Sequence, residues 1–317
     1  LLEARGIKWI NGSITSIDPA TRSISVGGRR IEADALVVAL GAQMAVDKVP
    51  GFHDYAVNVY SHEAVPYAAE AVRNFKGGIL AIGIFGAPYQ CPPAPYEIAL
   101  TLNEVLHERG IDASIEVFSP QPMSLPLLGQ ATCSLVEGRL EEHGIHFTPN
   151  HKATRVEKNL VIFEDGSRLR FELLLGVPPH VCPAIVVQSG LTDGKPWIPV
   201  NPRTLETKFP GVYAIGDVTM IPLANGQQLP KAGVFAEGEG KIVAERIAAV
   251  FAGKDPEATF AGEGYCFMEI GGGEAQYVRG NFLAEPAPEI TLTEPSSQTL
   301  IEKRNFEAEH LKAWFGN

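Results

Sequence analysis

Two segments in the second half of the chain have residue types suited to a polar ligand with many hydroxyl groups. The first, at 213–217, is a short apolar run that ends in Gly216 and Asp217. Lys231 follows Asp217 by fourteen positions, in Pro-Lys-Ala-Gly at 230–233, where a long amphipathic helix is predicted to begin. Asp217 can accept hydrogen bonds from ligand hydroxyls, and a helix N-terminus offers free amides to electron-rich ring atoms. Because Gly-Asp after a strand is also common in ordinary α/β turns, this pattern alone leaves the ligand open.

Cys91 is the second candidate for chemistry. It lies in a proline-rich loop, Cys-Pro-Pro-Ala-Pro-Tyr-Glu at 91–97, between a strand predicted over 78–86 and a helix predicted over 96–109. The dipole of a helix N-terminus favours a thiolate, and Glu97 in the first helical turn is placed for a proton donor or acceptor role. A lone cysteine is more often an inert buried side chain, but this loop context favours a reactive thiol.

The same loop differs from a dinucleotide-binding turn. A Gly-x-Gly-x-x-Gly fingerprint would directly follow the 78–86 strand, whereas here the glycines have another spacing and four prolines stiffen the turn. The next predicted strand, at 113–118, ends without the acidic residue that would bind an adenine ribose. We therefore do not expect NADH to bind at this position.

The elements around these residues predict an α/β fold. Strand, helix and strand follow one another over 78–118, a βαβ unit that implies a parallel sheet. A β-meander is predicted within 7–28, and the continuous apolar run at 35–42 is typical of a strand buried on both faces. This run ends in Gly41 and Ala42, where the backbone can approach a ligand closely.

We predict two Rossmann-like domains, the second inserted in the first, followed by a small C-terminal segment. The first domain comprises residues 1–62 and 180–255, the second residues 63–179, and the segment residues 256–317. A chain of 317 residues is long enough for two such units. Because residues 1–7 resemble the last turns of a helix, we expect the N-terminal part of the first domain to be missing.

The composition narrows the class of protein. A formal net charge of −11 argues against nucleic acid as a partner, because phosphate binding needs a basic surface. No apolar run approaches the roughly 20 residues that span a bilayer, and four cysteines in so long a chain predict a reducing, cytoplasmic compartment. A mild amphipathic pattern at 306–315 could contact a membrane interface peripherally. Such a helix more often docks on its own domain or on the second subunit of a homodimer.

The Gly-Asp segment and the helix start together resemble the FAD-dependent pyridine nucleotide-disulfide oxidoreductases. The Cys91 loop and Leu-Pro-Lys-Ala-Gly at 229–233 resemble, more narrowly, the sulfide:quinone oxidoreductase and flavocytochrome c sulfide dehydrogenase family. This resemblance implies FAD as cofactor, with Lys231 as a cation near the N1/O2 edge of the flavin; an ordinary solvated lysine is the alternative. The positions that the resemblance assigns to cofactor binding are Gly41, Ala42, Gly216, Asp217, Lys231, Ala232 and Gly233.

The resemblance also implies a pair of redox cysteines. The loop cysteine of the family pairs with a second cysteine from the C-terminal region, for which Cys266 is the matching candidate here. Such a pair accepts sulfur from sulfide or a related donor and passes two electrons to FAD, with a quinone or a cytochrome as final acceptor. Glu97, from its place in the first turn of the helix after the loop, is the candidate catalytic carboxylate. Many quinone-reducing members have a third cysteine upstream of the loop, but none occurs at 57–62, so handling of long sulfur chains is not expected.

Two other functions stay open. The same fold is used by type II NADH:quinone oxidoreductases, and an incomplete relative could be a catalytically inactive flavin-binding or interaction module. The glycine-rich turn that binds the FAD pyrophosphate in the superfamily does not occur in residues 1–60. We therefore expect weak FAD binding and poor stability for the isolated chain. We predict no metal ligands.

Overall fold

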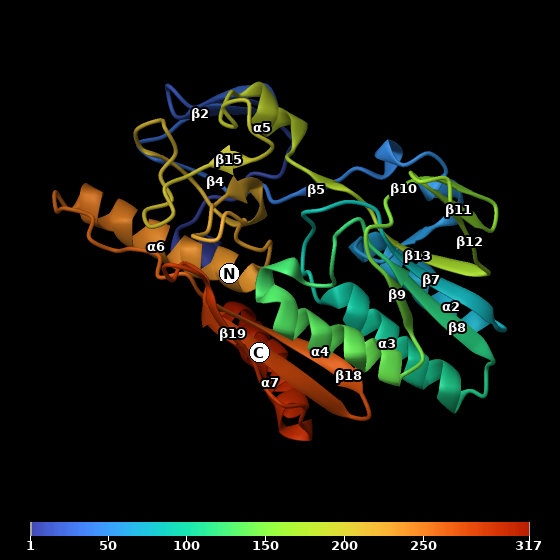
Figure 1. The fold of residues 1–317 in the computed structure, drawn as a ribbon. Coiled ribbons are helices and arrows are strands. Elements are labelled where there is room, and N and C mark those ends of the chain that lie inside the picture. The colour runs from blue at the N-terminus through green and yellow to red at the C-terminus, as the bar shows by residue number, and fades with distance from the viewer. Residues whose placement is uncertain (1, 317) are drawn as a thin grey trace.

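The computed structural model describes residues 2–316, and its largest sheet has five parallel strands (Figure 1). The order of the strands is β6-β13-β7-β8-β9. Helix α3 connects β7 to β8, so the predicted βαβ unit and the α/β class are confirmed. The bounds of these elements are β6 (Val57–Asn58), β7 (Gly78–Ile84), α3 (Ala94–Glu108), β8 (Ala113–Phe118), β9 (His146–Thr148) and β13 (Leu173–Val177).

Side chains alternate across β7, and both faces of the sheet are covered. Leu80 and Ile82 are fully buried on the face that packs against α3 and α4. Ala81 lies on the opposite face, in a core that includes residues of a small antiparallel sheet. Burial on both faces explains the almost uninterrupted apolar sequence of β7. The covering elements are α4 (Gly129–Glu142), β10 (Ala153–Glu157), β11 (Leu160–Phe163) and β12 (Arg168–Arg170).

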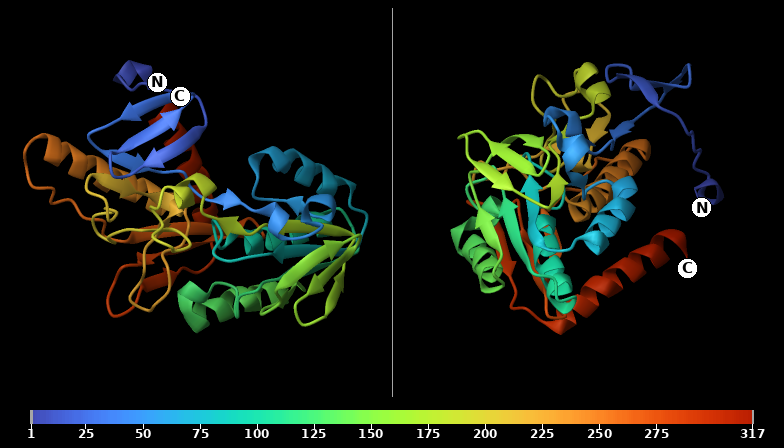
Figure 2. Two further views of the ribbon diagram at one scale, coloured as in Figure 1. Left: turned by 90° about the horizontal axis from the view of Figure 1, so that it is seen from above. Right: turned by 90° about the vertical axis from the view of Figure 1, so that its right-hand side faces the viewer.

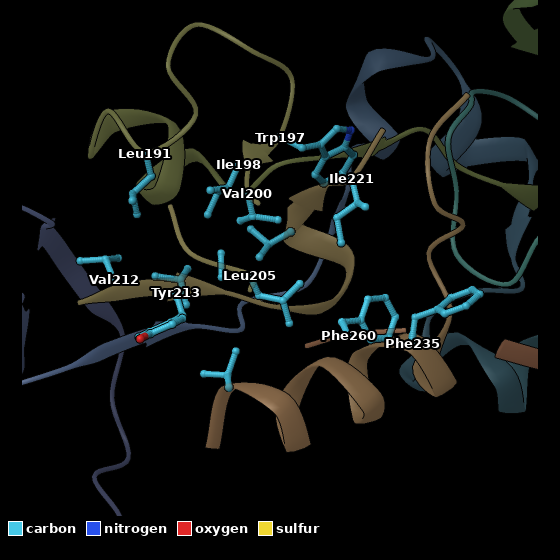
Figure 3. Packing of buried hydrophobic residues seen from close by; sticks show 14 of the residues in the cluster. Leu191, Trp197, Ile198, Val200, Leu205, Val212, Tyr213, Ile221, Phe235 and Phe260 are labelled. Atoms are coloured by element: carbon cyan, nitrogen blue, oxygen red, sulfur yellow. The ribbon is translucent and has the colours of Figure 1, made fainter. Parts of the chain in front are cut away.

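A second core lies between short strands and helix α6 (Figure 3). Strand β4 pairs in parallel with β16, and β15 pairs in parallel with β17. Phe235 and Val243 of α6 are buried in this core. The predicted β-meander is confirmed as β1-β2-β3. The bounds are β1 (Ile14–Asp18), β2 (Ser23–Val26), β3 (Arg29–Glu32), β4 (Leu36–Val38), α5 (Ala184–Gln188), β15 (Ile198–Pro199), β16 (Val212–Ala214), β17 (Thr219–Met220) and α6 (Gly233–Phe251).

The strand predicted over 35–42 is shorter and more open than its apolar sequence indicates. Strand β4 ends at Val38, and two of its apolar neighbours in the sequence are partly open to solvent. Val37 is 38% exposed and Leu40 is 40% exposed. Within residues 2–316, β16 is its only partner strand. The prediction of burial on both faces was therefore wrong, because an apolar run indicates burial only where neighbouring elements cover both faces.

Two adjacent chain segments connect the five-stranded sheet with the core around α6. Strand β5 (Gln43–Met44) pairs antiparallel with β14 (His180–Val181), so the segments that enter and leave the five-stranded sheet lie side by side. The exact domain boundaries proposed from the sequence stay a prediction. The remaining short elements are η1 (Glu3–Arg5), η2 (Val46–Lys48), α1 (Phe52–Tyr55), η3 (His62–Ala64), α2 (Val65–Asn74), η4 (Pro126–Leu128) and η5 (Gly216–Val218).

The C-terminal segment forms a three-stranded antiparallel sheet and a long helix. The sheet consists of β18 (Glu263–Gly271), β19 (Glu274–Asn281) and β20 (Glu289–Leu292), and α7 (Ser297–Phe315) packs on it. The helix begins earlier than the predicted Phe306, because the Ser296 side chain caps it by accepting the N–H of Thr299. Figure 2 shows α7 extending toward the side of the molecule on which the N-terminal segment lies.

Candidate functional site

An apolar pocket of about 340 Å³ lies where the Cys91 loop, the start of α6 and the C-terminal sheet meet. Its walls come from residues 87–93, residues 121–128, residues 227–235 and the strands β18 and β19. Most lining side chains are leucine, proline, valine or phenylalanine, and the two sulfur atoms of the site lie on this wall. A pocket of this size and polarity suits a small organic ligand.

Cys91 and Cys266 are neighbours on the pocket wall. Both are free thiols; Cys91 is exposed at the pocket and Cys266 is half-buried on β18. The interaction between the two side chains lowers the pKa of the Cys91 thiol and raises the pKa of the Cys266 thiol. The pair is therefore asymmetric, with Cys91 as the thiol that more readily becomes a thiolate.

The backbone at Cys91 is held in a left-handed conformation, with φ of +45°. Its N–H donates to the carbonyl oxygen of Lys231 at 2.8 Å, and its own carbonyl accepts the Tyr60 hydroxyl at 3.1 Å and the Ala94 N–H at 3.0 Å. A non-glycine residue keeps such a conformation only where surrounding contacts enforce it. These three bonds hold in place the backbone from which the thiol projects.

The Cys91 loop is docked on the segment that contains Asp217 and Lys231. Gln90 forms a parallel β-bridge with Lys231, and its side-chain amide donates to Asp217 Oδ2 at 2.6 Å. The thiol pair and the Gly-Asp segment, which are far apart in the sequence, thus form adjoining parts of one site.

Lys231 is buried rather than solvated, with 5% of its surface exposed. Its ammonium group lies 3.4 Å from the centre of the Trp197 ring and donates to the carbonyl oxygens of Asp217 and Thr219. Burial lowers its pKa from 10.5 to about 8. The alternative of an ordinary solvated lysine is therefore wrong. The start of α6 provides a buried cation whose charge is easily removed.

Three charged or titratable side chains of the site were missed in the sequence, and the first two lie close to Lys231. Glu239 on α6 is 1% exposed, and its Oε2 accepts the N–H of Gly216 at 2.5 Å. His180 is buried, and its Nε2 has no hydrogen-bond partner among residues 2–316. Lys303 forms an ion pair with Glu97 at 2.6 Å. Only Glu239 had a local signal, because it occupies the apolar stripe of α6.

The other residues predicted to bind the cofactor are Gly41, Ala42, Ala232 and Gly233. Gly41 adopts a left-handed φ of +64°, and the Ala42 side chain packs against the core below β16. Ala232 directly precedes α6 and lines the pocket, and Gly233 is the first residue of the helix. Contact of these residues with a cofactor stays a prediction.

Glu97 lies in the first turn of α3, outside the residues that line the pocket. One carboxylate oxygen accepts the N–H of Glu269 at 2.9 Å, and the other binds Lys303. Both oxygens are thus engaged by neighbouring elements. A direct role for Glu97 in proton transfer stays a prediction.

The residues around Gly216 fit the polar part of a flavin cofactor. A smaller cavity is bordered by Gly216, Asp217, Lys231 and Glu239. A Cβ atom at Gly216 would meet the Ala236 side chain at 3.1 Å, so a close backbone approach is built into this turn. Together with the unpartnered His180 nitrogen nearby, this cavity offers charge and hydrogen-bonding groups to a polar ligand.

Aromatic rings pack near the carboxyl ends of β7 and β8, the edge at which nucleotides bind in open parallel sheets. Phe85 follows β7 and packs edge to face against Phe52 and Phe118, and Phe118 packs in the same way against Phe163. These rings are buried in the core between the sheet and the strands β10 and β11, whereas the loops that follow β7 and β8 line the apolar pocket.

Comparison with known proteins places this geometry in a family. A family model described as pyridine nucleotide-disulphide oxidoreductase matches residues 2–240. The mitochondrial sulfide:quinone oxidoreductase of Mus musculus is 23% identical over 232 residues, which are 68% of this chain and 52% of that protein. The alternative NAD(P)H-ubiquinone oxidoreductase C1, chloroplastic/mitochondrial, of Arabidopsis thaliana is 29% identical over 253 residues, 70% of this chain and 46% of that protein. The chain thus spans about half the length of the curated relatives it matches.

Among solved structures, the sulfide:quinone oxidoreductase from the hyperthermophilic bacterium Aquifex aeolicus has a similar fold. The TM-score is 0.86 at 23% sequence identity, over 100% of this chain and 78% of that one. None of the helices between residues 2 and 316 combines the length and the apolar composition needed to cross a bilayer.

Proposed function

Because the chain belongs to the pyridine nucleotide-disulphide oxidoreductase family, we propose that it oxidises sulfide or a related thiol through Cys91 and Cys266 and delivers the electrons to a quinone or a cytochrome. The family consists of FAD-dependent oxidoreductases. The supporting observation is the contact of two thiols on the wall of an apolar pocket, next to the Asp217 and Lys231 cluster.

FAD, when bound, supplies a two-electron acceptor that can be reoxidised by a quinone. The residues that would hold its polar part are Gly216, Asp217 and Lys231, because they border one small cavity and provide a carboxylate and an ammonium group beside it. Lys231 would stabilise negative charge on the cofactor, since its ammonium group is shielded from water.

The thiol chemistry follows from the asymmetry of the pair. In the oxidised pair, HS⁻ attacks Cys266 Sγ and breaks the disulfide, giving a persulfide on Cys266 and a thiolate on Cys91. Cys91 is the better leaving group because its pKa is the lower one. A second thiolate, RS⁻, then removes the outer sulfur as RSSH and leaves a thiolate on Cys266. Loss of two electrons from the two thiolates re-forms the disulfide, so that HS⁻ and RS⁻ have become RSSH; bound FAD would be the acceptor of these two electrons.

The test is an anaerobic titration of the flavin-loaded protein with sodium sulfide, with flavin absorbance as readout. We expect bleaching in the wild type and at least a tenfold slower bleaching in Cys91→Ser and Cys266→Ser. Cys133→Ala is the matched control, because Cys133 is buried on α4 and does not itself line the pocket. Unchanged sulfide-dependent bleaching in both serine variants would remove the thiols from the mechanism.

A type II NADH:quinone oxidoreductase is the second candidate, supported by the Arabidopsis relative. The proline-rich turn after β7 weighs against it, because the turn lacks the glycine spacing that admits a dinucleotide. NADH added in place of sulfide distinguishes the two functions. Rapid bleaching by NADH, with none by sulfide, would support the second candidate and contradict the first.

The electron acceptor and the location of the protein form the last part of the proposal. A quinone is an apolar acceptor that resides in membranes, and the exposed Leu311, Trp314 and Phe315 at the end of α7 could contact the bilayer surface. Flotation with lipid vesicles tests this contact, and Trp314→Ser with Phe315→Ser should abolish it. Flotation that persists in this double variant would exclude the end of α7 as the contact. The cytoplasmic compartment and the homodimer stay predictions.

A further inference from the structure

Three charged side chains from three different elements meet behind the thiol pair. Glu97 belongs to α3, Glu269 to β18 and Lys303 to α7. The Lys303 ammonium group lies 2.6 Å from Glu97 Oε1 and 3.7 Å from Glu269 Oε1. The side chains of Lys303 and Glu97 are only 29% and 24% exposed, so this pair is better shielded from solvent than a typical surface ion pair.

This cluster connects the two segments that contain the cysteines. Glu97 lies in the first turn of the helix that the Cys91 loop enters, and Glu269 lies on the same strand as Cys266. Glu97 Oε2 accepts the backbone N–H of Glu269 at 2.9 Å. One carboxylate thus spans from the helix that follows Cys91 to the strand that holds Cys266.

Lys303 fixes the orientation of that carboxylate. It binds the oxygen that the Glu269 N–H does not use, and α7 itself is anchored by the buried Thr299 and Leu300. A carboxylate held by both a cation and a backbone N–H forms charge-assisted hydrogen bonds, which are stronger than neutral ones. A shift of α7 would therefore also change the contact between α3 and β18.

We propose that Glu97 and Lys303 are positioning residues that hold Cys91 and Cys266 at the separation a disulfide requires. The inference rests on the proposed function, in which the two thiols cycle between dithiol and disulfide. It makes the C-terminal helix a part of the redox site, although no residue of α7 lines the pocket. It also gives Glu97 a role through other residues instead of direct proton transfer.

The charges also act on the pKa values of the two thiols. Lys303 lowers the pKa of both thiols, whereas the carboxylate of Glu97 raises the pKa of both. Removal of Lys303 alone would leave an unbalanced negative charge beside the pair and disfavour the thiolates. Less stable thiolates react more slowly, but they also make the reduced pair less favourable, so this charge effect alone would raise the equilibrium constant for disulfide formation. A lowered constant in a Lys303 variant therefore reports the loss of positioning.

The experiment measures how readily the disulfide forms in the full chain, independently of flavin and of sulfide. The protein is equilibrated with glutathione redox buffers, in which one glutathione disulfide and two protein thiols give one protein disulfide and two reduced glutathione molecules. Mass spectrometry after acid quenching and alkylation counts the oxidised Cys91–Cys266 pair. The equilibrium constant has the unit of concentration and reports how well the two thiols are positioned.

We expect Lys303→Met to lower this constant at least tenfold and Lys303→Arg to stay within about threefold of the wild type, because arginine preserves the charge-assisted bond. Glu97→Gln, which keeps an acceptor for the Glu269 N–H but loses the ion pair, should lower it as well. Arg304→Met is the matched control, since Arg304 is exposed on the same helix and forms no ion pair among residues 2–316.

The outcomes separate the two proposals. If the wild type forms the disulfide and Lys303→Met forms it equally well, the positioning role is refuted and the proposed function stands. If the wild type forms no such disulfide at any buffer ratio, the proposed function fails and the positioning role fails with it. Should Lys303→Met not fold, Glu97→Gln alone decides, and a value within twofold of the wild type refutes the role.

Discussion

Replacement of Glu239 by glutamine should make the protein more stable at neutral and alkaline pH. Glu239 is 1% exposed on α6, and its carboxylate is close to Asp217. Burial, assisted by the negative charge of Asp217, raises its pKa from 4.5 to about 7. Glutamine preserves the shape of the side chain and an oxygen that can accept the Gly216 N–H, but it has no charge to bury.

The magnitude follows from the difference between the folded and unfolded pKa values. Between pH 4.5 and 7 the folded state binds more protons at this position than the unfolded state, so the free energy of unfolding falls as the pH rises. At one pKa unit per 1.36 kcal/mol, the cost of Glu239 is about 1 kcal/mol at pH 5 and about 3 kcal/mol at pH 8. The variant removes this cost, and its advantage over the wild type should grow with pH.

Urea unfolding of the wild type and Glu239→Gln at pH 5, 6, 7 and 8 measures this difference directly. We expect the two unfolding curves to be closest at pH 5 and to separate progressively toward pH 8. Other titrating groups act on both proteins alike and cancel in the comparison. A difference that does not change with pH, or a variant less stable at pH 8, would refute the argument, since either result means that Glu239 is not buried as a costly charge.

Two further predictions use the same site and its supporting strands. Cys266→Ser should shift the pH profile of Cys91 alkylation by iodoacetamide upward, because the neighbouring thiol lowers the pKa of Cys91; an unchanged profile would mean that the two side chains do not interact. Gly264→Ala should lower the free energy of unfolding by about 1–3 kcal/mol, since the new Cβ would lie 2.0 Å from a ring atom of Phe235. Gly240→Ala is its control in helix α6: the new Cβ has only an ordinary contact at 3.6 Å, so a gain of up to about 1 kcal/mol is expected in the same unfolding assay.

The parts of the fold that the sequence predicted correctly are those with local periodicity. The strand at β7 and the helices α3 and α6 have strong apolar patterns and short-range start signals, so their existence followed from residue types alone. The terminal helix was predicted too short, because its first half packs on β19 and its N-terminal cap at Ser296 was overlooked. The strand predicted at 35–42 was too long, because burial depends on covering elements that a single segment does not reveal.

The site was harder to predict because its contacts join distant segments. The residue types of Cys91 and Asp217 drew attention, but the bond from Gln90 to Asp217 spans 127 positions, and the one from Lys303 to Glu97 spans 206. A lysine on a terminal helix has no local feature that marks it as part of a redox site. Its importance becomes visible only when α3 and β18 are placed together, which is the same packing that brings the two thiols into contact.

The same packing explains why the charged groups of this site are distributed as they are. Lys231 and Glu239 are buried at a cost, as the shifts of their pKa values toward the neutral forms indicate. Glu97 and Lys303 lie nearer the surface and neutralise one another. A site that must accept electrons benefits from the first pair, because a buried cation becomes most favourable when negative charge arrives beside it. Glu97 and Lys303, in contrast, are proposed to hold the two thiols in position. An ion pair near the surface suits this positioning role, whereas the buried Lys231 suits charge stabilisation.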